Sequence, residues 1–90
     1  MHLLQKKTED EVFATIGKVE KNPIKGKPYF LAYPEDKHLL REGEHISCLL
    51  ENFRDDISPE KGQVVKLHGV REYATGWRAR FAEPVTLSTK

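Results

Sequence analysis

A cluster of arginine and tyrosine residues near the C-terminus has the chemistry to bind another molecule. Its members are Arg71, Tyr73, Arg78 and Arg80. They lie in two runs of strand-forming residues, 63–73 and 77–87, which are separated by a turn-prone stretch, so this segment predicts a β-hairpin. Guanidinium groups contact phosphates and aromatic rings stack on bases, which makes the cluster a candidate surface for single-stranded nucleic acid.

The length of the hairpin loop decides whether these side chains share a face. A two-residue loop at residues 75–76 places all four on one side of the hairpin and directs Trp77 toward the core. A three-residue loop instead pairs Tyr73 with Trp77, and it moves Arg78 and Arg80 to the other side. The shorter loop is the favoured interpretation, and the longer one is the alternative.

Other basic and aromatic residues extend the candidate site. The lysine loop (residues 21–28) contains three lysines and no acidic residue, and the predicted strand after it, residues 29–33, presents two tyrosines on one face. Lys66 and His68 belong to the first strand of the hairpin, where Gly69 is a candidate for a bulge that changes their face. The predicted nucleic-acid site comprises Lys25, Lys27, Tyr29, Tyr33, Lys66, His68, Arg71, Tyr73, Arg78 and Arg80.

Residues with catalytic or metal-binding chemistry are scattered. The four histidines lack the i, i+4 spacing of a helical zinc site, and the single cysteine excludes an internal disulfide. Apolar neighbours indicate that Cys48 is a buried, inert thiol. Asp55 and Asp56 are adjacent in a predicted loop, where they diverge instead of forming an acid–base couple. We therefore expect a binding protein without catalytic residues, metal or cofactor.

Composition bounds the size and class of the protein. Ninety residues with 38% hydrophobic and 32% charged side chains indicate one small domain, and a net charge of +1 argues against a general DNA-coating protein. The charge is polarised, however. Residues 63–81 carry four basic residues against Glu72, whereas residues 51–60 carry four acidic residues against Arg54. This polarity favours an alternative function as a protein-interaction module or accessory subunit, which docks onto a larger enzyme or, through its oppositely charged surfaces, onto a copy of itself.

Turn signals divide the chain into five short predicted strands. These are residues 11–20, 29–33, 45–52, 63–73 and 77–87. Gly17 inside the first strand suits a bulge. The pattern indicates a single all-β barrel or sandwich domain over residues 11–87, with a flexible lead-in at residues 1–10 and a tail at residues 88–90. No signal peptide or membrane-spanning run is present, so a cytoplasmic protein without membrane contact is expected.

Residues 17–47 resemble the opening of cold-shock-type OB domains, a nucleic-acid-binding family. The matching motifs are GKV at residues 17–19, KGKPYFL at residues 25–31, PED at residues 34–36 and LREGE at residues 40–44. The resemblance implies a small five-stranded OB-like antiparallel barrel with a C-terminal hairpin, and RNA or single-stranded DNA as partner. It carries over Tyr29 as a base-stacking residue. Lys27 stands where the family has its first stacking aromatic residue, and Pro28 replaces the second glycine.

Overall fold

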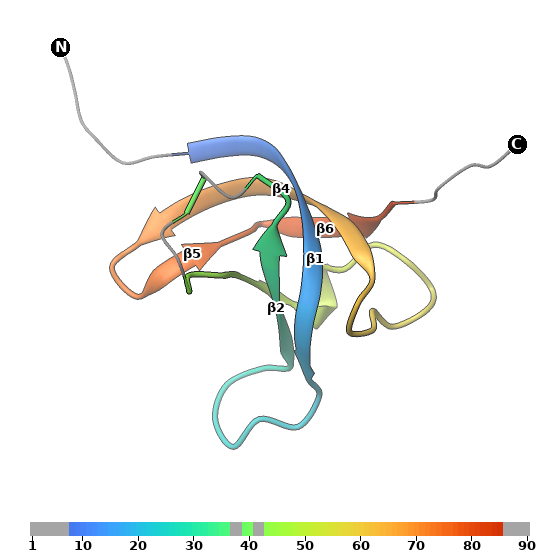
Figure 1. Cartoon of the computed structure of the whole chain (residues 1–90). Helices are drawn as coiled ribbons and strands as arrows, with labels where there is room; N and C mark the ends of the chain where they lie inside the picture. Colours follow the sequence, from blue (N-terminus) through green and yellow to red (C-terminus); the bar gives the residue numbers. More distant parts are fainter. Residues whose placement is uncertain (1–7, 37–38, 41–42, 86–90) are drawn as a thin grey trace, which may run out of the picture.

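The computed structural model describes residues 8–36, 39–40 and 43–85. This part of the chain forms six β-strands and one short 3-10 helix. In chain order the elements are β1 (Thr8–Glu20), β2 (Tyr29–Pro34), β3 (Ile46–Leu49), η1 (Leu50–Asn52), β4 (Val64–Tyr73), β5 (Gly76–Arg78) and β6 (Phe81–Pro84). In Figure 1 the strands curl around one another, and the lysine loop extends away from the ends of β1 and β2.

The strands close into a ring in the order β1-β2-β3-β5-β4, because β4 pairs with β1 as well as with β5. Neighbouring strands are antiparallel except β3 and β5. A closed ring of five strands needs at least one parallel pair. If every neighbouring pair were antiparallel, strand directions would alternate around the ring, and with an odd number of strands the last and the first would point the same way. β6 pairs with residues 65–68 of β4, whereas β5 pairs with residues 71–73, and β6 is an extra strand outside the ring. The predicted small five-stranded barrel is thus confirmed, with one parallel pairing in place of a wholly antiparallel order.

The first strand is longer than predicted. Thr8 pairs with Arg71, so β1 begins three residues earlier than expected and the end of the predicted lead-in (residues 1–10) is strand. The cause is β4, which is long enough to offer these residues backbone partners. Residues 1–7 and the predicted tail at 88–90 lie outside the described residues.

Two other predicted strands are shorter or divided. β3 ends at Leu49, and the chain then makes a 3-10 turn in which the Phe53 backbone N–H donates to the Leu50 carbonyl oxygen at 3.0 Å. The last predicted strand, residues 77–87, is divided into β5 and β6 at residues 79–80. The division allows β5 to pair with β3 while β6 stays beside β4.

Alternate residues of the strands build one apolar core. Phe30 and Ala32 of β2 and Ile46 and Cys48 of β3 face inward, as the alternation of their sequence predicts. The Phe30 ring meets the Phe53 ring edge to face, with centroids 6.0 Å apart, which anchors the chain after η1. The buried apolar residues are Val12, Ala14, Ile16, Phe30, Ala32, Ile46, Cys48, Phe53, Val65, Leu67, Val70, Trp77, Ala79 and Ala82.

Gly17 forms the predicted bulge in β1. The register with β2 shifts between Ile16 and Lys18, which leaves Gly17 without a partner. The ring of Tyr33 lies over this glycine, and a Cβ there would collide with the ring. The bulge bends the part of β1 that pairs with β2, whereas the first half of the strand pairs with β4 in an unbroken register.

Gly69 marks a change of face in β4. Leu67 and Val70 are both buried although they are three residues apart, and Gly69 between them has φ +65°. The pairing register is the same before and after this point, so no residue is inserted and the predicted bulge is instead a bend. The stem of the Arg80 side chain packs against the glycine, where a Cβ would lie 2.8 Å from Arg80 Cδ.

We expect Gly69→Ala to lower the free energy of unfolding by about 1–3 kcal/mol, because alanine is strained at positive φ and its Cβ meets Arg80. Gly62→Ala is the matched control, since Gly62 has φ +91° but no atom within 4 Å of the added Cβ. Urea unfolding followed by the fluorescence of Trp77 measures both variants. Equal losses in the two would contradict a role for the Arg80 contact.

Candidate nucleic-acid interface

The hairpin turn consists of residues 74–75, because Tyr73 pairs with Gly76 and Arg71 with Arg78. The loop has two residues, as the favoured interpretation predicts, but it lies one residue earlier than the predicted 75–76, and the three-residue alternative is wrong. Gly76 has φ +129°, which glycine adopts readily, and it begins β5 instead of lying within the loop. The observed register differs from the favoured prediction by two residues, and a shift of two leaves every side chain on its face. Arg71, Tyr73 and Arg78 consequently share one side, as the favoured interpretation predicts.

Trp77 belongs to the core and is not a platform for a ligand. Its side chain is 5% exposed, and its backbone lies beside Ile46 in the parallel pairing of β3 and β5. The indole Nε1 has no hydrogen-bond partner among the described residues. Packing of the ring, rather than a polar contact, therefore holds Trp77 inside and keeps its neighbours in β5 outside.

The outer sides of four neighbouring strands form one continuous surface. Leu31 of β2 pairs with Ser47 of β3, Ser47 pairs with Arg78 of β5, and Arg78 pairs with Arg71 of β4. Directly paired residues point to the same side of a sheet, so these side chains form a row across the barrel. We call this surface the basic-aromatic face. The predicted site residues on it are Tyr29, Tyr33, Arg71, Tyr73 and Arg78. Arg80 lies at its boundary, where the stem of its side chain packs against Gly69.

A groove opens on the basic-aromatic face between the lysine loop and β5. It has a volume of about 320 Å³. The described residues that line it are Lys25, Gly26, Lys27, Tyr29, Ser47, Cys48, Leu49 and Arg78. Gly26 has φ +82°, and this turn places a lysine on each side of it at the groove. Four predicted site residues from two separate stretches of the chain, residues 25–29 and Arg78, thus meet in one cavity.

Positive charge dominates the groove. Its described lining includes three cationic side chains and no carboxylate. At its edge, Lys27 Nζ lies 3.2 Å from the Glu51 carboxylate, and the Arg78 guanidinium lies 5.3 Å from the centroid of the Tyr73 ring. Both contacts are exposed to water, where an ion pair or a cation–π contact contributes about 1 kcal/mol or less. An anionic ligand can therefore displace them.

Two half-exposed tyrosines extend the face beyond the groove. Tyr33 lies on β2 and contacts His45 edge to face, with ring centroids 6.0 Å apart. Tyr73 lies at the hairpin turn on β4. Each ring retains exposed surface, so the two tyrosines add apolar, stackable area on either side of the arginines.

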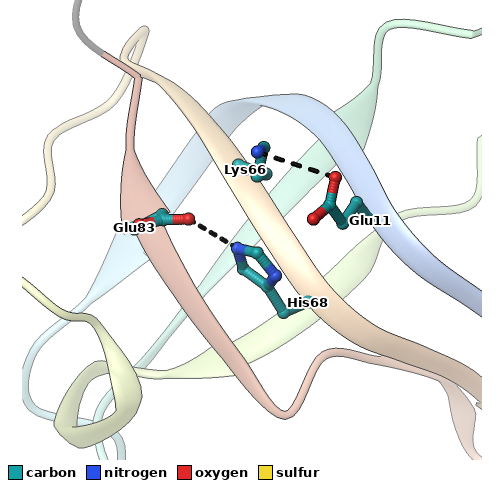
Figure 2. A network of polar contacts seen from close by, with 4 residues as sticks. All are labelled: Glu11, Lys66, His68 and Glu83. Atoms are coloured by element: carbon teal, nitrogen blue, oxygen red, sulfur yellow. Dashed lines mark hydrogen bonds and ion pairs between the residues drawn. The ribbon is translucent and has the colours of Figure 1, made fainter.

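Lys66 and His68 lie on a different face from the basic-aromatic face, although the predicted site grouped them with its residues. Here β4 is flanked by β1 and β6, and the bend at Gly69 divides the two faces. Lys66 Nζ lies 3.6 Å from Glu11 Oε1, and His68 Nε2 lies 2.7 Å from Glu83 Oε2, as Figure 2 shows. The structure therefore does not bring these two residues to the groove, and each has a carboxylate partner.

The same face holds a stack of planar groups. The rings of His68 and Phe81 are parallel within 5°, with centroids 4.4 Å apart. Arg54 Cζ lies 4.0 Å from the centroid of the Phe81 ring. At these distances the His68 ring and the Arg54 guanidinium occupy opposite sides of the Phe81 ring. The stack fastens the segment after η1 to β6 and β4, so it is a structural contact that keeps Arg54 away from the groove.

Sequence reasoning missed the floor of the groove. Ser47 and Leu49 form it together with Tyr29. Their alternation with buried residues of β3 indicates that they face outward, but no local signal indicates which strands lie beside β3. Ser47 Oγ donates a hydrogen bond to the Trp77 carbonyl oxygen at 3.3 Å, which ties the floor to β5.

Comparison with protein-family models, with curated proteins and with solved structures returned no match, so similarity assigns the chain to no family. Within the described residues, no three His, Cys, Asp or Glu side chains are grouped to hold a metal ion. The same part of the chain contains no helix of the length and apolarity needed to cross a membrane. The geometry of the groove therefore carries the functional interpretation.

Cys48 lines the floor of the groove only through its backbone, because its side chain points into the core and is 1% exposed. This burial raises the pKa of its thiol to about 12 from the ordinary 9.0. We expect iodoacetamide to label the folded protein very slowly from about pH 7 to about pH 10, whereas the urea-unfolded protein reacts faster as pH rises through its ordinary pKa. Mass spectrometry measures the rates, and fast labelling of the folded protein would contradict the burial.

Proposed function

We propose that this protein binds single-stranded nucleic acid, RNA or DNA, along the basic-aromatic face. The observation that carries the proposal is the groove, in which Lys25, Lys27 and Tyr29 meet Arg78 from a distant part of the chain. The proposed role is binding rather than catalysis. In OB-type barrels, oligonucleotides bind across strands 2 and 3 between the 1–2 and 4–5 loops. The lysine loop and the hairpin turn occupy these two positions here.

Each part of the face has a function in the proposed complex. Bases stack on the exposed tyrosines, and stacking on an aromatic ring contributes about 1–3 kcal/mol per base. Lys25, Lys27 and Arg78 contact phosphates at the groove, and a guanidinium group also stacks on a base. Because stacking on the tyrosines does not depend on charge, the protein can bind nucleic acid with useful affinity although its net charge is only +1.

A second candidate function is docking onto a protein, including another copy of this chain. The acidic segment (residues 51–60) favours it, because Asp55, Asp56 and Glu60 are exposed there and its charge is opposite to that of the lysine loop. Nucleic acid is preferred, since the cations and the aromatic rings share one groove-bearing face, whereas the acidic segment presents no comparable set of rings.

Arg78→Gln is expected to weaken binding of an oligonucleotide of about ten nucleotides by about tenfold, because a phosphate or base contact in the groove is lost. The slope of log K against log salt concentration should become shallower by about 0.7. Fluorescence anisotropy with labelled mixed-sequence RNA and DNA, at low and moderate salt, measures both quantities.

Lys66→Gln is the matched control for this loss, since it removes one positive charge from the face that is turned away from the groove. It should change the affinity by less than about twofold. The proposal fails if the unaltered protein binds RNA and DNA no better than millimolar, and the docking function then becomes the preferred one. Equal effects of the two substitutions would show that only net charge matters.

Glu51→Gln is expected to strengthen oligonucleotide binding by about two- to fivefold at low salt, because its carboxylate no longer competes with phosphate for Lys27. Glu83→Gln removes the same charge next to His68, away from the groove, and should leave the affinity unchanged. The same anisotropy assay compares them. If the Glu51→Gln variant binds like the unaltered protein, Lys27 does not contact the oligonucleotide.

A further inference from the structure

Ile24 is a large aliphatic residue at the tip of the lysine loop, and its side chain is completely exposed, at 101% of the reference area. It does not belong to the core or to the partly buried residues that pack against the core. The fold therefore gains no apolar burial from this side chain. The surface of Ile24 remains available to a ligand.

The position of Ile24 relative to the groove is set by the chain itself. The three residues that follow it, 25–27, all line the groove. Pro23 restricts the backbone before it, and the positive φ of Gly26 turns the chain after it. Ile24 itself does not line the groove, and it lies next to Lys25 at the groove's edge. A nucleic-acid strand that contacts Lys25 and continues past this edge comes beside Ile24.

We propose that Ile24 contacts an unstacked base at the loop end of the groove, and that this contact makes the site selective for single strands over duplex. This inference rests on the proposed nucleic-acid function. In a single strand a base can rotate out and lie against an aliphatic side chain, which removes apolar surface of both from water. In a duplex the bases are paired inside and the lysines meet only phosphates, so Ile24 gains nothing.

Ile57 provides a matched comparison for Ile24. It is also largely exposed, at 70%, but it lies in the acidic segment next to Asp55 and Asp56. A polyanion is repelled at this position, so the apolar side chain there has no part in the proposed complex. Replacement of either isoleucine by serine removes exposed apolar surface only, and both variants should fold like the unaltered protein.

The test compares Ile24→Ser and Ile57→Ser by anisotropy with a single-stranded oligonucleotide and with a hairpin duplex over a series of salt concentrations. Ile24→Ser should weaken single-strand binding by about fivefold and leave duplex binding unchanged. Its salt slope should equal that of the unaltered protein, because an apolar contact releases no counterions. Ile57→Ser should bind both probes like the unaltered protein.

Lys25→Gln distinguishes the charged contacts of the loop from the apolar one, because it should make the salt slope shallower for both probes. The inference is overturned if Ile24→Ser binds the single strand like the unaltered protein, weakens both probes equally, or matches Ile57→Ser. It is also overturned if Ile24 governs partitioning onto phosphatidylglycerol vesicles and not oligonucleotide affinity. If the unaltered protein binds neither probe, the proposed function itself fails, which is a different result from normal binding by Ile24→Ser.

Discussion

The barrel depends on β1, because its pairing with β4 closes the ring of strands. Its second half pairs with β2, its first half pairs with β4, and the bulge at Gly17 bends the part that pairs with β2. This double pairing closes the ring with five strands. An odd ring requires a parallel pair, and the pair is β3 with β5. Two segments that are distant in the sequence are thereby held side by side.

The candidate site follows from this closure. The parallel pairing sets Arg78 beside Ser47, and the loop that connects β1 to β2 brings its lysines to the same place. Without β5 next to β3, the arginines of the hairpin would lie on an isolated ribbon, and the lysines would have no opposite wall. The groove is thus a product of topology, and its residues come from segments that no local pattern connects.

The structure also distributes charge in a way that the net value conceals. On the face formed by β1, β4 and β6, carboxylates of Glu11 and Glu83 partner Lys66 and His68. In the groove the described lining has cations and no carboxylate, and Glu51 reaches only its edge. A chain with a formal charge of +1 therefore presents one surface with internal ion pairs and another with a concentrated positive charge. Local arrangement of charge, rather than its sum, bears on the proposed partner.

Alternation and turn residues by themselves determined the strands, most of the core and the side on which each hairpin residue lies. These properties are local, because the period of two along a strand and the conformations of glycine and proline belong to the backbone of each segment. The faces survived an incorrect register because the error was two residues and not one. Only the tertiary structure decided which strands are neighbours and where β4 changes face at Gly69. Lys66 and His68 were grouped with the arginines for lack of that information. Neighbouring strands are selected by ring closure and burial of the common core, which depend on the whole chain at once and leave no signature in any single segment.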